Sequence, residues 1–273
     1  MTQEYVPAGL DPEVAAQFAA ARVAVHRTCY AEADTLLQVA LARAPDHPLL
    51  VAYAALLARV LYRDSAPLAG RARELLRRSE SVDDDLPEAL VGWAVRDLVT
   101  AEERLRAFVA RVPRDPFARH LLGATQLARG SVQEAVGTLE SLISDDSDFT
   151  PALNHLGAAY LALGEVDRGL ATLRHFVERD PGNASARDSL AGALEQAGDR
   201  EAAIGQLTRA LLLDPSFAYA WLHLGEILEQ LGETDLAARA YRTARDAPGA
   251  YGAAFVDVAE KNLARLGRDG DPQ

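Results

Sequence analysis

Hydrophobic and polar positions follow a helical period through residues 150–181. Leu153, Leu156 and Tyr160 fall three and four residues apart, and a second apolar run follows Gly164 and ends at a proline. Apolar residues at this spacing lie on one face of an amphipathic helix, and the glycine marks a turn. The stretch therefore predicts a helical hairpin. One hairpin cannot bury its apolar face alone, so the pattern should recur along the chain.

The pattern recurs with a period of about 34 residues, in units that begin at positions 14, 48, 82, 116, 150, 184 and 218. Small residues at fixed places allow two helix backbones to cross closely, and large apolar residues beside them fill the layer. The twentieth place is small in six of the seven units. The eighth place is Ala or Gly in all of them: Ala21, Ala55, Ala89, Gly123, Gly157, Ala191 and Gly225.

This helix–turn–helix period resembles the tetratricopeptide repeat (TPR) family over about 240 residues, nearly the whole chain. The last unit carries the family's motif with one Leu for Tyr, as Trp221-x2-Leu224-Gly225-x2-Leu228 followed by Ala237-x3-Tyr241. The family's closing proline is matched by Pro45, Pro113, Pro181 and Pro215, and its turn glycine by Gly130, Gly164, Gly198 and Gly232. The resemblance implies an all-α fold, a right-handed superhelical solenoid of about seven TPR repeats with a C-terminal capping helix.

The repeat pattern divides the chain into four parts. Residues 1–11 are expected to form an N-terminal arm, 12–250 the repeat array, 251–266 a capping helix and 267–273 a flexible tail. The capping helix is expected because an uncovered last repeat would expose its packing face. Its apolar face is predicted from residues that share one side of a helix: Tyr251, Phe255, Val258, Asn262 and Leu266.

Helix starts are marked by polar residues. Asp11 followed by Pro12 reads as an N-cap and first helical position. Two further starts carry the spacing of a capping box, in which a hydroxyl residue and a glutamate three residues on satisfy each other's backbone N–H groups. These pairs are Thr100 with Glu103 and Ser131 with Glu134.

Composition narrows the class of protein. The chain has 273 residues, 49% of them hydrophobic and 6% aromatic, and a net charge of −12. It can therefore build a helical core, and it lacks the basic patch that nucleic acid requires. Cys29 is the only cysteine, so an internal disulfide is excluded and a reducing compartment is expected. The sequence shows neither a signal-peptide pattern nor an apolar run long enough to span a membrane, so we expect a cytoplasmic protein.

The sequence contains few residues in patterns that are typical of catalytic or metal sites. The phosphate-binding, dinucleotide-binding, metalloprotease and serine-hydrolase motifs are absent, and no two of the six histidines stand three or four residues apart. The repeats also leave no room for a catalytic domain. We therefore expect no enzymatic activity, no cofactor and no metal site.

The remaining candidate is the groove that the family forms on its concave side, where places 2, 5, 6, 9, 12 and 13 of each first helix point inward. The resemblance places an apolar and aromatic floor in repeats 2 to 4, which includes Tyr53, and an acidic surface in repeats 6 and 7. Such a gradient favours a protein or peptide that is basic or neutral at the end lying over repeats 6 and 7. The candidate groove residues are Phe117, His120, Asn154, His155, Asp188, Tyr219, His223 and Glu226.

His120, Asn154 and His155 should lie on neighbouring helices. Three interpretations stay open at this stage: groups that hydrogen-bond a ligand's backbone, ordinary solvated or packed side chains, or a metal site. The favoured function is a non-catalytic interaction scaffold that binds a peptide or protein segment in the groove. The alternatives are an assembly factor of a larger complex, of the secretion or pilus type, and a regulatory subunit of an enzyme encoded by another chain. The oligomeric state is left open.

Overall fold

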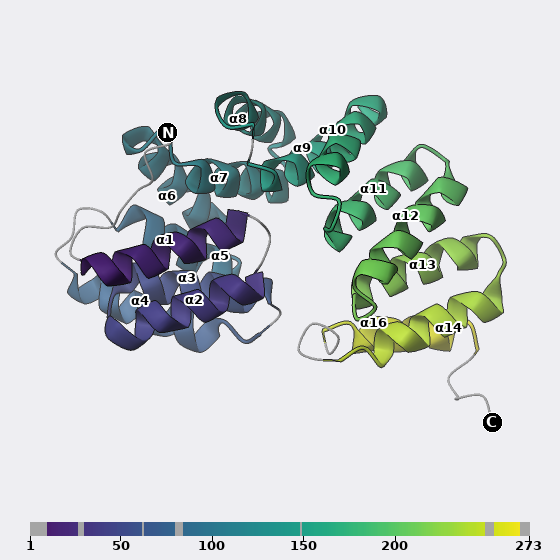
Figure 1. Cartoon of the computed structure of the whole chain (residues 1–273), viewed down its shortest axis with the longest axis horizontal. Coiled ribbons are helices and arrows are strands. Elements are labelled where there is room, and N and C mark those ends of the chain that lie inside the picture. The colour runs from purple at the N-terminus through teal and green to yellow at the C-terminus, as the bar shows by residue number, and fades with distance from the viewer. Residues whose placement is uncertain are drawn as a thin grey trace. The chain divides into compact units, whose positions relative to one another are not determined.

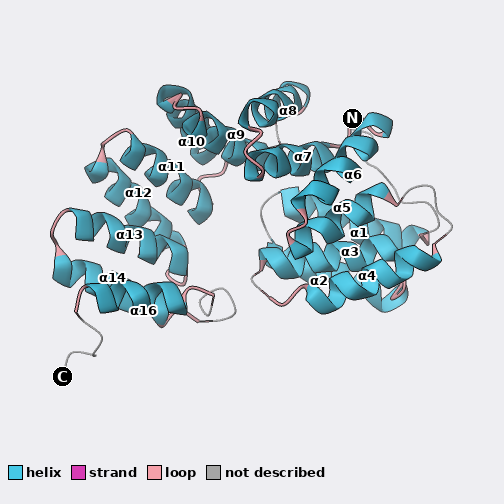
Figure 2. Cartoon of the chain, turned by 180° about the vertical axis from the view of Figure 1, so that it is seen from behind, coloured by secondary structure: helices cyan, strands magenta, loops and turns pink. Residues whose placement is uncertain are grey.

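The structure is a computed structural model that describes residues 10–26, 30–61, 63–79, 84–147, 149–248 and 254–267. Within these residues every regular element is a helix, and no strand is present (Figure 2). The prediction of an all-α helical-repeat fold is thus confirmed. The helices are α1 (Pro12–His26), α2 (Tyr30–Arg43), α3 (Pro48–Val60), α4 (Ala66–Arg78), α5 (Asp85–Val95), α6 (Leu98–Arg111), α7 (Pro116–Ala128), α8 (Val132–Asp145), α9 (Pro151–Ala162), α10 (Val166–Arg179), α11 (Ala184–Gln196), α12 (Arg200–Leu213), α13 (Ala218–Gln230), α14 (Thr234–Arg245) and α16 (Val256–Arg265).

Consecutive helices pack as antiparallel hairpins, as α1 with α2, α3 with α4, α5 with α6, α7 with α8, α11 with α12 and α13 with α14 (Figure 1). The second helices α6, α8, α10, α12 and α14 begin at positions 98, 132, 166, 200 and 234, which is one constant interval. Only α4 departs from it, since it begins at position 66 where the same interval would give 64. The chain divides into two compact units, unit 1 at residues 1–159 and unit 2 at residues 160–273.

The turns inside the later hairpins depend on a left-handed residue. Gly130, Gly164, Gly198 and Gly232 have φ between 78° and 85°, a region that L side chains rarely adopt. The residue after each glycine donates its N–H to a carbonyl five residues earlier, which closes the helix end as in a Schellman motif. Arg96 occupies the place in its repeat that Gly130 occupies in the next one, and it takes the same conformation at φ 64°.

Both predicted capping boxes are wrong. α6 is capped by Asp97, whose side chain accepts a hydrogen bond from the Thr100 backbone N–H. Ser131 stands at the start of α8 and makes no side-chain cap bond. In α6 the carboxylate is the stronger acceptor, and it stands one helical turn earlier than the hydroxyl chosen from the sequence. At the first described helix, Asp11 does accept from the Glu13 N–H at 2.9 Å.

Small residues at the eighth place lie in the interior. Gly123 lies so close to Leu139 on α8 that a β-carbon would overlap that side chain, and Gly225 stands in the same relation to Tyr241 on α14. The five other eighth-place residues are also buried. This close approach of first and second helices positions the inward side chains of each repeat.

The apolar face of the last helix differs from the predicted one. Val258 is exposed, whereas Ala259 and Leu263 are buried against α14, with Phe255 and Leu266 packed beside them. The buried positions therefore follow Phe255 in steps of four, at Ala259 and Leu263 in place of the predicted Val258 and Asn262. Tyr251, the first residue of the predicted face, lies outside the described residues, as do Cys29 and most of the N-terminal arm.

Candidate binding surfaces

In unit 1, His120 of α7 and His155 of α9 are in direct contact. The His120 Nε2 and His155 Nδ1 atoms are 2.9 Å apart, and the rings meet edge to face with centroids separated by 4.8 Å. The Phe149 ring also lies near His120, with ring centroids 5.3 Å apart. Burial lowers the pKa of His155, and a hydrogen bond with the Pro151 backbone offsets this only partly. The pair is a packed contact between repeats, while Asn154 beside it is half-buried.

Phe117 is not on an open surface. It is 2% exposed and stacks on Tyr53, with ring centroids 5.0 Å apart. Phe18 of α1 also contacts Tyr53 in a T-shaped arrangement, with ring centroids 4.9 Å apart. The expected aromatic floor is therefore filled from within unit 1, because large apolar rings gain more from mutual burial than from facing water.

An ion pair that the sequence did not reveal closes the same region. Arg22 of α1 and Asp115, the N-cap of α7, meet at 2.6 Å with side chains 4% and 0% exposed. Asp115 also accepts the Ala118 backbone N–H at 2.8 Å, and the Arg22 guanidinium lies 5.7 Å from the centre of the Phe117 ring. The two partners stand 93 residues apart, so no local pattern could have paired them.

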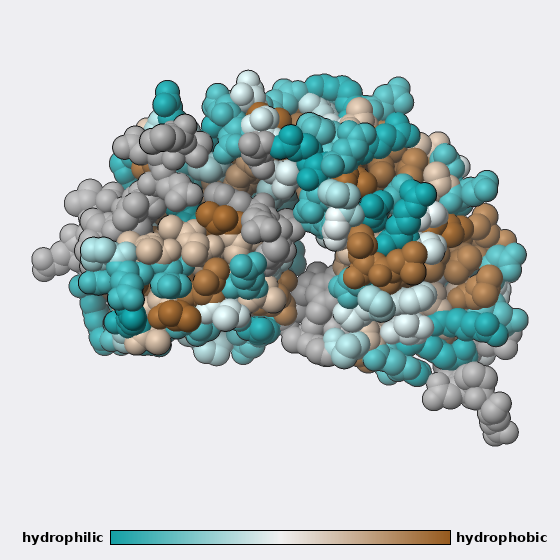
Figure 3. Space-filling model, viewed as in Figure 1, coloured by the Kyte–Doolittle hydropathy of each residue, from teal (hydrophilic) through white to brown (hydrophobic). Residues whose placement is uncertain are grey.

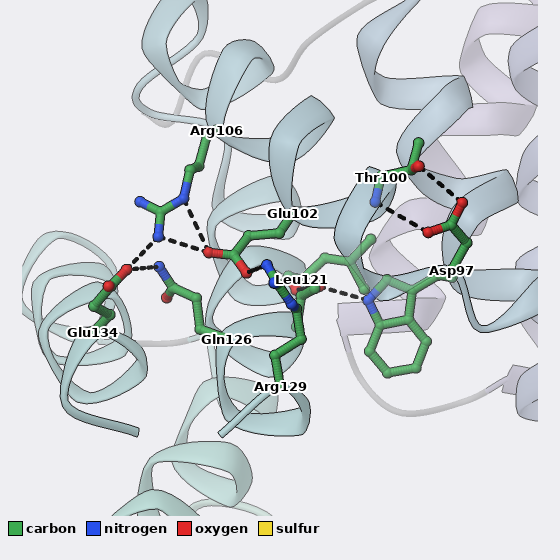
Figure 4. Close-up of polar contacts among 10 residues, drawn as sticks. Asp97, Thr100, Glu102, Arg106, Leu121, Gln126, Arg129 and Glu134 are labelled. Carbon is green, nitrogen blue, oxygen red and sulfur yellow. Dashed lines mark hydrogen bonds and ion pairs between the residues drawn. The ribbon is translucent and has the colours of Figure 1, made fainter. Parts of the chain in front are cut away.

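A second polar network lies between α6, α7 and α8 (Figure 4). Glu102 is buried and pairs with both Arg106 and Arg129, and Arg106 reaches on to Glu134. Burial alone would raise the pKa of Glu102, but the two arginines outweigh it and leave that pKa below its usual value. The carboxylate is thus saturated by its neighbours, and the network joins two repeats.

In unit 2, the side chains of α11 and α13 form a polar face. His223 of α13 lies between two carboxylates of α11, with Nδ1 2.9 Å from Asp188 and Nε2 3.2 Å from Glu195. Gln230 donates to the other Glu195 oxygen at 3.0 Å. Burial lowers the pKa of His223, but the hydrogen bonds and charges of Asp188 and Glu195 outweigh it, so the pKa is raised. The imidazole is held in place from both sides.

Tyr219 and Glu226 extend this face along α13. Tyr219 is 47% exposed, and its ring lies 5.7 Å from Phe255 and 6.4 Å from His223. Glu226 is an exposed residue, and partial desolvation of its carboxyl raises the pKa above the usual value. Hydrophilic groups over α11 and α12 adjoin hydrophobic groups over α13 on the side shown in Figure 3. We call Asp188, Glu195, Tyr219, His223, Glu226 and Gln230 the α11–α13 face.

The described part of the chain offers neither a metal site nor a membrane-spanning helix. No group of three or more His, Cys, Asp or Glu side chains there could hold a metal ion. No described helix is long and apolar enough to cross a membrane. A hollow of about 310 Å³ does lie between α4, α5 and α6, but none of the predicted groove residues lines it.

A family model described as Tetratricopeptide repeat matches residues 154–207 and 189–251, which include the α11–α13 face. The comparison with curated proteins found no match. The matched region contains the starts of α10, α12 and α14 and the last three of the glycine turns described above.

Solved structures are similar over more of the chain. A thermophilic TPR protein of Thermus thermophilus superposes with a TM-score of 0.61 at 21% identity, covering 68% of this chain and 99% of that one. A tetratricopeptide repeat protein from Parabacteroides merdae has a TM-score of 0.62 at 12% identity, covering 94% and 99%. The human IFIT1 dimer with m7Gppp-AAAA has a TM-score of 0.66 at 16% identity, covering 86% of this chain and 59% of that one. At these identities the likeness is one of fold.

Proposed function

Because the chain is a tetratricopeptide repeat protein, we propose that it is a non-catalytic interaction scaffold and that the α11–α13 face binds a segment of a partner protein. The observation that carries this proposal is the 47% exposure of Tyr219 on the helix that also carries His223 and the exposed Glu226, with His223 in contact with Asp188 and Glu195 of α11. Exposed aromatic side chains next to several charges of one sign are typical of protein interaction sites.

The charge of the face defines the partner's chemistry. Three carboxylates and one imidazole converge within two neighbouring helices, and the chain as a whole carries a net charge of −12. A lysine- or arginine-bearing segment would meet complementary charge there, whereas the phosphates of a nucleic acid would be repelled. Tyr219 would pack on the aliphatic stem or the guanidinium of such a side chain. We therefore propose a basic peptide segment as the ligand.

A peptide-binding titration tests this proposal. A fluorescently labelled, arginine- and lysine-rich peptide is titrated into the full chain and into the Glu195→Gln/Glu226→Gln variant. We expect the variant to bind about tenfold more weakly, which corresponds to about 1.4 kcal/mol. The matched control is Glu178→Gln/Glu201→Gln, which removes the same charge from exposed positions on the second helices α10 and α12.

The control variant separates local recognition from net charge. If it weakens binding as much as Glu195→Gln/Glu226→Gln does, the peptide is attracted only by the overall charge of the chain, and the proposed face is wrong. Tyr219→Ala gives a second check, since it leaves the charge unchanged and should still reduce affinity.

A further inference from the structure

His223 contacts a carboxylate through each of its two ring nitrogens. Nδ1 is 2.9 Å from Asp188, and Nε2 is 3.2 Å from Glu195. An ionised carboxylate only accepts hydrogen bonds, and a neutral imidazole has one N–H group and one lone pair. Both contacts are therefore hydrogen bonds only while the imidazole carries two protons and a positive charge. The space between the two carboxylates is thus occupied by a cation that belongs to the chain itself.

Gly192 makes room for this cation on α11. Asp188, Gly192 and Glu195 stand four and three residues apart, so they share one face of the helix. Gly192 leaves space on this face, and the His223 ring lies over it, since a β-carbon at Gly192 would be 3.7 Å from the His223 Cε1 atom. The space is filled by a flat, positively charged group, and a guanidinium has the same shape and charge.

The two contacts of the imidazole are unequal. The side chain of Asp188 is 10% exposed and that of Glu195 is 25% exposed, and the contact with Glu195 is the longer one. Gln230 donates to the other Glu195 oxygen at 3.0 Å and accepts from Arg200 of α12 at 3.1 Å. When the imidazole loses a proton, its remaining N–H stays with the nearer Asp188, and the Nε2 lone pair faces Glu195. Glu195 is then left without a cation and without that donor.

The remaining charged groups near His223 come from α13, α14 and α16. Glu226 and Glu229 of α13 add negative charge, and Arg265 of α16 adds positive charge close to Glu226. Glu229 already accepts from Arg265 at 2.7 Å and from the Tyr241 hydroxyl of α14 at 2.8 Å. Glu226 is exposed and adds to the negative potential around the imidazole. The surroundings therefore favour a cation next to Glu195, whether it comes from the chain or from a ligand.

We propose that an arginine side chain of the ligand replaces the His223 proton at Glu195, so that binding releases one proton. This inference rests on the proposed function and deepens it, because it assigns one cationic group of the ligand to one carboxylate. A guanidinium can bond both oxygens of Glu195, and the Tyr219 ring, centred 6.4 Å from that of His223, is within reach of its flat face. One positive charge arrives while one proton leaves to solvent, so the charge between α11 and α13 is unchanged.

The affinity for such a ligand should rise with pH. Burial alone would lower the pKa of His223, but Asp188 and Glu195 outweigh it and raise that pKa above the ordinary value of 6.5. The probe is an acetylated and amidated peptide with several arginines and no other ionisable residue, so its own charge stays constant. We expect the full chain to bind it about tenfold more tightly at about pH 8.5 than at about pH 6. Equal affinity at the two pH values would overturn the inference.

Three variants assign the pH dependence to His223. His223→Gln cannot become charged, so its affinity should be equal at both pH values. His175→Gln is the matched control, since it removes an exposed imidazole of α10 and should keep the tenfold change. Glu226→Gln should bind more weakly at both pH values but keep their ratio. If His223→Gln keeps the change or His175→Gln abolishes it, the inference is wrong.

Proton NMR of the His223 ring, identified by the resonance that His223→Gln lacks, tests the coupling without relying on the affinities. In the free chain the ring should be more than half protonated at pH 6.5, and saturation with the peptide should lower its pKa by about one unit. A ring that is neutral at about pH 6 in the free chain would overturn the inference whether or not a peptide binds.

The same data separate this inference from the proposed function. If the peptide binds and the Glu195→Gln/Glu226→Gln variant weakens it, but the affinity does not change with pH, only the proton exchange is wrong. If the peptide binds at neither pH, the proposed function is wrong and the proton exchange is wrong with it.

Discussion

Units 1 and 2 use the same repeat positions in opposite ways. Phe117 in unit 1 and Tyr219 in unit 2 both occupy the second place of their repeats, yet Phe117 is 2% exposed and Tyr219 47% exposed. At the sixth place, Tyr53 in unit 1 lies inside an aromatic stack, whereas His223 in unit 2 lies among carboxylates. The backbone of a repeat therefore directs a side chain inward, but the chemistry of the neighbouring side chains decides whether that position is covered.

The physical reason is the cost of removing water from each surface. Rings such as Phe18, Tyr53 and Phe117 each gain about 1.5–3 kcal/mol when buried, so they draw α1 onto α3 and α7. Glu226 stays exposed to water and Glu195 partly so, whereas Asp188 is only 7% exposed and is compensated by its contact with His223. Tyr219 and Glu226 of the α11–α13 face consequently stay accessible to an external ligand, whereas Tyr53 and Phe117 of unit 1 are covered from within.

The largest expected effect follows from breaking the ion pair of unit 1. Asp115→Ala leaves Arg22 buried without its partner and removes the cap of α7, so unit 1 should lose about 3–5 kcal/mol of stability. Urea unfolding followed by hydrogen exchange measures this loss. The matched change in unit 2 is Asn183→Ala, which removes the cap at the same place before α11 and should cost about 1 kcal/mol. Equal losses of stability from the two substitutions would show that the Arg22–Asp115 ion pair contributes no stability beyond that of the N-cap.

Two glycines of unit 2 test the close helix crossing. Gly225→Ala should destabilise the chain by about 1–3 kcal/mol, because its β-carbon would overlap the Tyr241 ring. Gly192→Ala is the control, since its nearest new neighbour, His223, is 3.7 Å away and alanine favours α11 by up to about 1 kcal/mol. The urea midpoints of the two variants should move in opposite directions. If both urea midpoints move in the same direction, the close crossing of α13 and α14 at Gly225 is contradicted.

A third effect concerns the turn between α5 and α6, where Arg96 stands in the place of the glycine. Arg96→Gly should stabilise unit 1 by about 1 kcal/mol, because an arginine in the left-handed region is strained and glycine is not. Gly130→Ala, one repeat later in the same unit, should destabilise it by a similar amount. Thermal unfolding of both variants gives the comparison, and a loss of stability in Arg96→Gly would mean that the arginine side chain outweighs the strain.

The smallest expected effect is a pH dependence of opposite sign in the two units. His155 has a lowered pKa, so the folded unit 1 takes up its proton less readily than the unfolded chain and loses stability as pH falls below the ordinary value of 6.5. His223 has a raised pKa, so its contribution to unit 2 is fully present below 6.5 and is lost as pH rises through the folded value.

Hydrogen exchange of the amides near each histidine, corrected for the intrinsic rate at about pH 8 and about pH 5.5, measures the two trends. Acidification should weaken protection around His155 and strengthen it around His223. His155→Gln and His223→Gln should each flatten the corresponding trend. Trends of the same sign in both units would show that other groups control the pH dependence.

The repeat pattern predicted what depends on local spacing. The eighth-place residues from Ala21 to Gly225 are buried as expected, and the glycine turns from Gly130 onward adopt the required conformation. These features recur at a fixed interval because each repeat solves the same packing problem against its neighbour.

What the sequence did not reveal depends on long-range pairing. Arg22 and Asp115 look like ordinary surface charges in their own helices, and only the approach of α1 to α7 makes them partners. Phe117 was assigned to a groove for the same reason, because its place in the repeat points inward whether or not another helix covers it. His120 and His155 were expected to be neighbours, but their direct contact depends on side-chain orientation, which the period does not specify.

The most direct test of the central claim is hydroxyl-radical footprinting of the intact chain, read out by mass spectrometry. After correction for intrinsic reactivity, we expect strong oxidation of Tyr219 and protection of Tyr53 and Phe117, because neighbouring rings of unit 1 cover Tyr53 and Phe117 while Tyr219 in unit 2 is 47% exposed. Oxidation of Phe117 and Tyr219 at similar rates would contradict it, since both repeat positions would then be open to solvent.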